Sequence, residues 1–208
     1  NATMSTMCLQ AKDGQLNFVG LDGHVLAWDK IDYDGEFELL IPKKTIDKLK
    51  TLGLTGEVRI RHSNAMAIFA TEDFEICTRL VQGEYYKYQN MFKELPLHTV
   101  ISRKELLDAM VRAKMCTAEK CPVKFEIAGS QLGLSIKDQT TDYHETVDLQ
   151  EDISEELTIG FDARLVIETL KAFDCDNVGI SLQGPKMPMI VEAEDSDFKT
   201  IVLPVAIK

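Results

Sequence analysis

Four histidines carry the most obvious chemistry in this chain, because imidazole titrates near neutral pH and is a common metal ligand. They are His24, His62, His98 and His144. None stands at a metal-ligand spacing, and the place of His24 in a hairpin is more typical of a turn or of packing. The chain also lacks a G-x-S-x-G elbow, a P-loop and G-x-G-x-x-G. We therefore predict no catalytic residue, no metal site and no cofactor.

Carboxylates could supply acid–base catalysis, and they gather along residues 142–156 and 192–197. Because these carboxylates are spread over a strand and a loop, a solvent-exposed edge is favoured over a catalytic acid/base pair. A hydrolase that used His24 with the first stretch is an alternative. Because a nucleophile, a base and an orienting group are not within reach of one another, a protein without catalytic activity is the favoured interpretation.

The cysteines indicate a compartment rather than a reaction. There are five, an odd number at scattered positions: Cys8, Cys77, Cys116, Cys121 and Cys175. Cys116 and Cys121 are isolated from other ligand types, so we expect reduced thiols in a cytoplasmic protein. No apolar run reaches the roughly 18 residues of a membrane span, and no signal peptide opens the sequence.

Basic residues are outnumbered but clustered. The chain has 23 Lys and Arg against 34 Asp and Glu, a net charge of −11, which alone argues against tight nucleic-acid binding. Ten basic residues nevertheless fall on three predicted helices: Lys43, Lys44, Lys48 and Lys50, then Arg103, Lys104, Arg112 and Lys114, then Arg164 and Lys171. Either both signs belong to solvated faces, or the helices share a weakly basic side while the sheets carry acid outward.

The elements that position these residues form a repeat. Residues from 38 read ELLIPKKTIDKLKTLGL, and residues from 156 read ELTIGFDARLVIETLKAF, with an offset near 117 throughout. Two copies of one domain fit a chain of 208 residues, and we divide it at 1–95 and 96–208. Helices segregated to one face of antiparallel sheets make each copy an α+β domain.

Periodicity and turn signals predict the elements of each copy. The first copy has strands at 7–11, 16–21, 25–30 and 37–41, a helix at 43–52, and strands at 58–62, 66–70 and 75–81. The second has a helix at 102–116, strands at 123–128, 132–136, 143–149 and 156–160, a helix at 162–173, and strands at 178–182, 188–193 and 198–203. Because only the second copy has an opening helix, we expect the chain to begin inside a domain.

The tyrosine-rich segment GEYYKYQNMF, from Gly83, leads out of the first copy. It could simply pack on that domain, or it could form a wall of a peptide pocket, for which aromatic and Met side chains are suited. The apolar run Ile201–Val205 near the C-terminus is continuous, which predicts a strand covered on both faces.

Three motifs resemble one family. LDGHVLA at 21–27 is similar to T-D-G-H-R-L-A of the bacterial DNA polymerase III β subunits, the sliding clamps. RLVQGEYYKYQNMF at 79–92 and IVLPVAI at 201–207 are similar to two further segments of that family, in the same order. The resemblance covers the chain and implies the middle and C-terminal domains of a clamp that has three per subunit.

The resemblance implies a non-catalytic processivity factor. Two full-length subunits would join head to tail around double-stranded DNA, with sheets outside and helices lining the channel, and sequence would not be read. The channel candidates are Lys43, Lys44, Lys48, Lys50, Arg103, Lys104, Arg112, Arg164 and Lys171, of which only a subset can point inward. Implied partners are DNA polymerase III alpha, clamp-loader subunits and other proteins with a clamp-binding motif, with no membrane involved.

The resemblance also implies a pocket for a Gln-Leu-x-Leu-Phe-like motif between the two domains. Its residues would be Met4, Leu21, Gly23, His24, Val25, Leu26, Tyr86, Asn90, Met91, Asp162, Leu165, Val178, Ile201, Val202, Leu203, Pro204 and Val205. Val25, Asn90 and Ala206 replace arginines of the usual pattern, Leu21 a threonine and Tyr86 a proline. A more apolar site should depend less on the peptide glutamine. A clamp-like peptide-binding scaffold that does not encircle DNA is the alternative.

Overall fold

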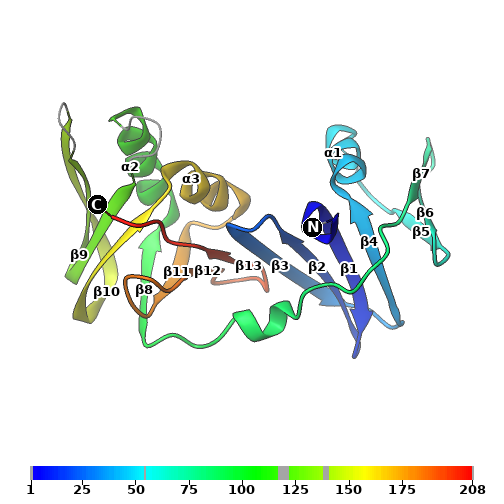
Figure 1. Cartoon of the computed structure of the whole chain (residues 1–208), viewed down its shortest axis with the longest axis horizontal. Coiled ribbons are helices and arrows are strands. Elements are labelled where there is room, and N and C mark those ends of the chain that lie inside the picture. Colours follow the sequence, from blue (N-terminus) through cyan, green and yellow to red (C-terminus); the bar gives the residue numbers. More distant parts are fainter. Residues whose placement is uncertain (1, 54, 117–121, 138–140, 208) are drawn as a thin grey trace. The chain divides into compact units, whose positions relative to one another are not determined.

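The computed structural model describes residues 2–53, 55–116, 122–137 and 141–207 (Figure 1). The chain divides into two compact units, residues 1–88 and residues 89–208. Both are built from antiparallel sheet and a few helices, so the α+β prediction is confirmed. In the described ranges no helix is long and apolar enough to span a membrane.

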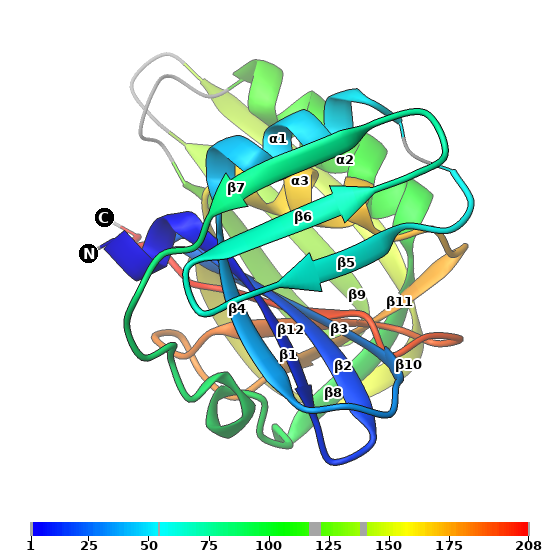
Figure 2. The same ribbon diagram turned by 90° about the vertical axis from the view of Figure 1, so that its right-hand side faces the viewer.

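The first unit contains one α-helix and two antiparallel sheets among its described residues. Its elements are η1 Ala2–Ser5, β1 Thr6–Lys12, β2 Gln15–Leu21, β3 Val25–Asp32, β4 Phe37–Pro42, α1 Lys43–Thr51, β5 Arg59–His62, β6 Met66–Ala70 and β7 Glu75–Arg79. One sheet has the order β4-β1-β2-β3, and the other, nearest the viewer in Figure 2, has the order β5-β6-β7.

Turn chemistry fixes the hairpins and the helix start of the first unit. Asp13 and Gly14 both take positive φ, the conformation of a tight turn that joins β1 to β2. Asp22 closes the next turn, because its carboxylate accepts hydrogen bonds from the N–H groups of His24 and Val25, each at 2.9 Å. Pro42 stands at the N-cap of α1, where its missing N–H does no harm.

The tyrosine-rich segment packs on the first unit. The Tyr88 ring is 1% exposed and lies edge-on to Trp28, with ring centroids 5.1 Å apart, and its hydroxyl donates to Gln10 at 3.1 Å. The Tyr85 hydroxyl donates to the carbonyl of Val19 at 3.3 Å. Burial raises the pKa of Tyr88 to about 12. The packing interpretation therefore holds for Tyr85 and Tyr88.

The second unit holds two α-helices within its described residues. Its elements are η2 Tyr88–Met91 (which straddles the boundary), β8 Leu97–Ser102, α2 Arg103–Cys116, β9 Val123–Lys137, β10 Asp142–Phe161, α3 Ala163–Ala172, β11 Asn177–Leu182, β12 Met189–Ala193 and β13 Lys199–Val202. The sheet order is β13-β12-β11-β8-β10-β9, and α2 and α3 lie side by side (Figures 1 and 2).

The structure differs from the predicted elements in three places. Strand β8 was not predicted, because Leu97–Ser102 runs from Pro96 directly into α2 with no turn residue to separate strand from helix. The strands predicted at 123–128 and 132–136 are one element, β9, which folds back near Gly129, so that Ser135 donates to Glu126 at 2.8 Å. The strands predicted at 143–149 and 156–160 likewise belong to β10, whose pairing with β9 shifts register after Asp148.

Strand order shows the repeat in three dimensions. In each unit the helix that follows the first set of strands (α1 or α3) leads into an antiparallel meander, β5-β6-β7 or β11-β12-β13. In the second unit β8 pairs with both β11 and β10, which joins the two parts of its sheet. The described residues of the first unit include no counterpart of β8 or α2, and its two sheets stay separate.

Candidate functional site

A cavity of about 280 Å³ opens on the first unit beside the hairpin tip. Three of the predicted pocket residues line it, Met4, Leu21 and Val25. The lining is mainly apolar, and its other residues are Ser5, Thr6, Met7, Gly20, Asp22, Ala27, Lys43 and Ile46. An apolar hollow with a few polar groups at its rim suits the Leu or Phe side chain of a peptide.

The hairpin tip fixes how the pocket residues around it lie. Gly23 has a φ of +92°, a conformation that favours glycine, and a Cβ there would come within 3.0 Å of the Met4 methyl. His24 is exposed at the tip. Leu26 on β3 is 1% exposed and supports the site from within. Tyr86 lies edge-on to Tyr85, with ring centroids 5.8 Å apart.

The predicted pocket residues of the second unit fall into a buried and an exposed group. Asp162 caps α3, accepting from the Arg164 N–H at 2.8 Å. The buried group, each at most 7% exposed, is Leu165, Val178, Ile201 and Val202. Met91, at 44%, and Leu203, at 38%, are exposed. Asn90 lies in η2, and the N–H of Val205, one residue after Pro204, donates to the Gly160 carbonyl at 2.9 Å.

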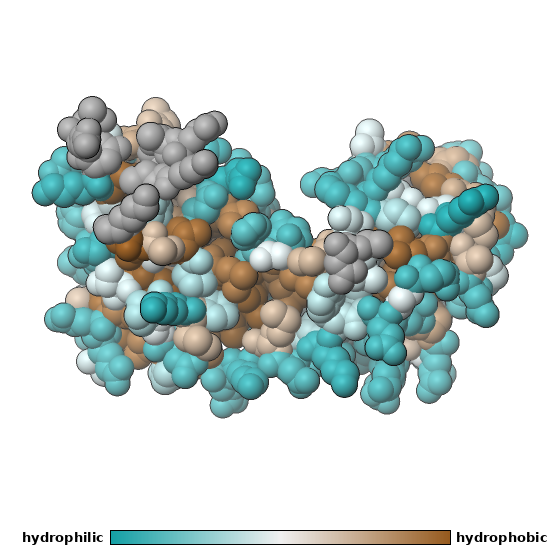
Figure 3. All heavy atoms as spheres, in the orientation of Figure 1, coloured by the Kyte–Doolittle hydropathy of each residue, from teal (hydrophilic) through white to brown (hydrophobic). Residues whose placement is uncertain are grey.

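Apolar residues gather on the second unit where α3 and β13 lie (Figure 3). Ile201 and Val202, on β13, and Leu165, on α3, are buried, and Leu203, directly after β13, is exposed. In the apolar run Ile201–Val205, Ile201 and Val202 are therefore buried, whereas Leu203 is exposed. Among the predicted site residues of the second unit, Met91 and Leu203 are the apolar side chains that are exposed.

The basic residues of α1 are exposed. The Lys43 ammonium pairs with Asp47 at 2.8 Å, an exposed pair one helical turn apart. Lys44, Lys48 and Lys50 have no hydrogen bond or ion pair to any residue the structure describes. These three ammonium groups can meet phosphates without giving up an internal partner.

The basic residues of α2 and α3 have more varied environments. Arg103 has a structural role at the end of α3. Its guanidinium donates to the carbonyl of Leu170, in the last turn of α3, at 3.5 Å, and to the carbonyl of Cys175, which follows the helix. Lys104 pairs with Asp108 at 2.7 Å, and Arg164 lies 3.7 Å from Asp162. Lys171 is exposed and makes no ion pair within the described ranges.

Arg112 forms a bidentate ion pair with a residue of the neighbouring sheet. It binds the Glu145 carboxylate of β10 through two nitrogens, and Tyr143 donates to the same carboxylate. The hydrogen bonds from Arg112 lower the pKa of Glu145. Since Arg112 already holds a carboxylate in a bidentate pair, it is less available to phosphate than the lysines of α1.

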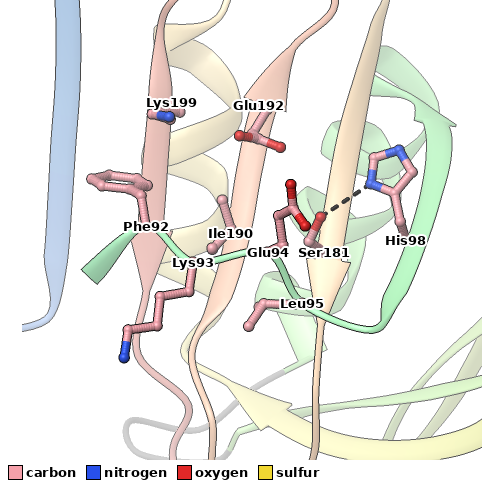
Figure 4. Close-up of a pocket in the computed structure, with 9 residues that line it drawn as sticks. All are labelled: Phe92, Lys93, Glu94, Leu95, His98, Ser181, Ile190, Glu192 and Lys199. Atoms are coloured by element: carbon pink, nitrogen blue, oxygen red, sulfur yellow. Dashed lines mark hydrogen bonds between the residues drawn. The ribbon is translucent and has the colours of Figure 1, made fainter. Parts of the chain in front are cut away.

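A second cavity, on the second unit, is one that the sequence did not predict. It has a volume of about 360 Å³ and contains a hydrogen bond of 3.0 Å between His98 Nδ1 and Ser181 Oγ (Figure 4). Sequence reasoning missed it because Ser181 and His98 are 83 residues apart, and only the pairing of β8 with β11 brings them together.

Metal and thiol chemistry can be assessed for the described residues. They contain no group of three His, Cys, Asp or Glu side chains that could hold a metal ion. Cys8, Cys77, Cys116 and Cys175 are free thiols, and Cys121 lies outside the described residues. Burial, with a smaller contribution from Glu38, raises the pKa of the Cys8 thiol to about 12.

The fold is that of the bacterial sliding clamps. A DnaN sliding clamp (DNA polymerase III subunit beta) from Pseudomonas aeruginosa, solved bound to griselimycin, matches with a TM-score of 0.92 at 23% identity. The match covers 99% of this chain and 58% of that one. The prediction of a DNA-clamp fold is thereby confirmed.

The sequence comparisons identify the family. The model for the DNA polymerase III beta subunit, C-terminal domain, matches residues 93–206, more than half of the chain. The beta sliding clamps of Vibrio cholerae and of Buchnera aphidicola are 27% and 23% identical, over 97% and 96% of this chain. The chain belongs to the DNA polymerase III beta subunit family, and it spans 57% of the length of each of these two relatives.

Proposed function

We propose that the chain supplies the middle and C-terminal domains, residues 1–95 and 96–208, of a DNA sliding clamp. The observation that carries the proposal is the family match to residues 93–206, together with a clamp fold over 99% of the chain. A clamp holds its polymerase on double-stranded DNA by topology, and it needs no catalytic group. In a bacterial cell the protein would work in the cytoplasm, as a head-to-tail dimer when full length.

The charge distribution supports sequence-independent contact with DNA. A clamp that slides must attract phosphates weakly and read no base edge, so a few lysines on an otherwise acidic protein suffice. The exposed lysines Lys44, Lys48, Lys50 and Lys171 fit this requirement best, since none has an internal ion-pair partner among the described residues. We propose them as the main channel contacts, with Lys43, Lys104, Arg112 and Arg164 contributing less and Arg103 serving the fold.

The peptide pocket is the proposed docking place for DNA polymerase III alpha, clamp-loader subunits and other partners. Its supporting observations are the 280 Å³ apolar cavity beside Met4, Leu21 and Val25, and the exposed side chains of Met91 and Leu203. Short peptides bind mainly through a few apolar anchors in such hollows. The Leu and Phe of a clamp-binding motif are the groups we expect these surfaces to hold.

A titration tests the proposal. A fluorescent peptide containing Gln-Leu-Ser-Leu-Phe should show saturable binding to the chain, and a peptide with Leu and Phe replaced by Ala should bind at least tenfold more weakly. Replacing the glutamine alone should have a smaller effect, because the resemblance implies that Val25 and Asn90 replace arginines of the family's usual pattern. The proposal fails if both control peptides bind as well as the parent, or if removing glutamine abolishes binding while removing Leu and Phe does not.

A further inference from the structure

The cavity that contains His98 and Ser181 shares no residue with the proposed peptide pocket or with the basic helices. It lies wholly within the second unit and is lined by one irregular segment and four strands (Figure 4). Its lining residues are Phe92, Lys93, Glu94 and Leu95 from the segment, and His98, Ser181, Ile190, Glu192 and Lys199 from β8, β11, β12 and β13.

Strand register brings the polar lining residues together. Ser181 stands opposite His98 in one pairing and opposite Ile190 in the other, and Glu192 stands opposite Lys199. Directly opposed side chains in an antiparallel sheet share one face, about 5 Å apart. This sheet face therefore presents a row of small, acidic and basic groups that the strand pairing itself fixes.

A hydrogen-bonded pair of side chains, Ser181 and His98, lies at the centre of the cavity. Ser181 is only 8% exposed, and its hydroxyl is held by His98 Nδ1 at 3.0 Å. Gly179 lets the imidazole lie against the strand, because a Cβ at that position would come within 3.0 Å of His98 Cε1. A hydroxyl can take part in more than one hydrogen bond, so Ser181 keeps capacity for a ligand.

The acidic and basic side chains around this pair occupy different parts of the cavity. In Figure 4 the carboxylates of Glu94 and Glu192 extend into the pocket, while the Lys93 ammonium points away from it. The Lys199 ammonium lies over the Phe92 ring, 5.1 Å from its centroid, at one end of the cavity. Neither carboxylate has a hydrogen bond or an ion pair with any described residue. The two carboxylates thus face a common space with their acceptor oxygens available to a ligand.

Apolar walls complete the site. Ile190 is 4% exposed, and Leu95 and Phe92 are half-buried above the strands. The two carboxylates and the hydroxyl suit a ligand with a cationic head, and these walls suit an aliphatic stem. The arginine side chain has both, and its planar guanidinium can bind several acceptors at once, which a lysine ammonium does less well.

We propose that this cavity binds the arginine side chain of an extended segment of a partner protein. The carboxylates of Glu94 and Glu192 receive the guanidinium, Ser181 supplies a further acceptor, and Ile190 and Leu95 contact the stem. The site is separate from the peptide pocket, so a partner could occupy both. The proposal does not depend on DNA binding.

Backbone amide NMR of the chain, titrated with Nα-acetyl-arginine N-methylamide, tests the proposal. We expect saturable shifts of the His98, Ser181 and Glu192 signals. The citrulline analogue, equal in shape but uncharged, should bind at least tenfold more weakly, and the lysine analogue should also bind more weakly. No shifts at these residues, or equal binding of the citrulline or lysine analogue, would overturn the assignment.

Two variants separate this site from the rest of the molecule. The double variant Glu94→Gln with Glu192→Gln keeps the shape of both side chains and should lose at least tenfold in arginine affinity. Glu155→Gln, an exposed carboxylate on β10, is the matched control and should bind as wild type does. Leu203→Ala should also leave arginine binding unchanged, so failure of the peptide pocket and failure of this site give different results. Unchanged binding in the double variant would contradict the proposal.

Discussion

At the scale of residues, exposure distinguishes the apolar side chains that can touch a peptide from those that support them. Leu26 and Val202 are 1% and 0% exposed, whereas Met91 and Leu203 are 44% and 38% exposed. The sequence places all four in the proposed pocket by resemblance, but their accessibility depends on which way each strand or turn presents them. Leu203 follows directly after the last residue of β13, which opens it to solvent.

Leu203→Ala should weaken binding of the clamp-motif peptide by about 1–4 kcal/mol, because truncating a central apolar anchor removes buried apolar area. His24→Ala should change affinity less, since His24 lies exposed at the hairpin tip. Fluorescence titration of both variants with one labelled peptide measures the difference, and circular dichroism should show the same fold for both. Equal affinities for wild type and Leu203→Ala would contradict the assignment.

Cys8 and Cys77 should differ strongly in reactivity. Cys8 is 0% exposed, and burial raises the pKa of its thiol to about 12, so it stays protonated at pH 8 and rarely forms the thiolate that attacks an alkylating agent. Cys77 is exposed. Iodoacetamide at pH 8, followed by peptide mass mapping, should modify Cys77 first and Cys8 only after denaturation. Equal labelling of the two in the folded protein would argue against the packing around β1.

At the scale of elements, α3 joins the two halves of the second unit and has a well-defined start. Asp162→Ala should lower the free energy of unfolding by about 0.5–2 kcal/mol, because the N-cap oxygen that accepts from the Arg164 N–H is removed. Asp162→Asn keeps an acceptor and should recover most of the stability. Urea denaturation of the three proteins gives the comparison. If both variants lost the same free energy of unfolding, the lost carboxylate charge would explain the effect, and the capping hydrogen bond would not.

The exposed lysines of α1 should contribute to DNA affinity in proportion to the phosphates they neutralise. Replacing Lys44, Lys48 and Lys50 with Gln should weaken binding to duplex DNA regardless of sequence, and should reduce the salt dependence of log K by about 1 for each phosphate no longer neutralised. Arg103→Gln should instead lower stability, because Arg103 holds the carbonyls at the end of α3. Fluorescence anisotropy at several salt concentrations, with Lys12→Gln as a control, distinguishes these effects.

Much of each unit was predictable because its local signals agree. Asp13-Gly14, Asp22 and Pro42 each fix a turn or a helix start through their own backbone chemistry, and the helices α1 and α3 begin and end within a residue of the prediction. Strand β8 was missed because nothing local separates it from α2, and its partners β11 and β10 are distant in sequence. The pocket of His98 and Ser181 was missed for the same reason.

At the scale of the whole molecule, the proposed function depends on a ring, and this chain spans 57% of the length of the relatives it matches. The resemblance implies three domains per subunit and a head-to-tail interface that uses different surfaces on the two sides. Residues 1–208 alone should therefore be monomeric in dilute solution and should leave circular and linear DNA equally fast. Sedimentation that showed a stable closed dimer of this polypeptide would contradict the expectation.

Retention on DNA of different topology tests the central claim most directly. The native protein, purified from its source and loaded with a bacterial clamp loader and ATP, would be followed by gel filtration on a nicked circular plasmid and on the same plasmid after linearisation. A sliding clamp should stay on the circle and run off the ends of the linear form, so cutting the circle should release it. Equal release from both forms would contradict encirclement and would favour a clamp-like scaffold that binds peptides without enclosing DNA.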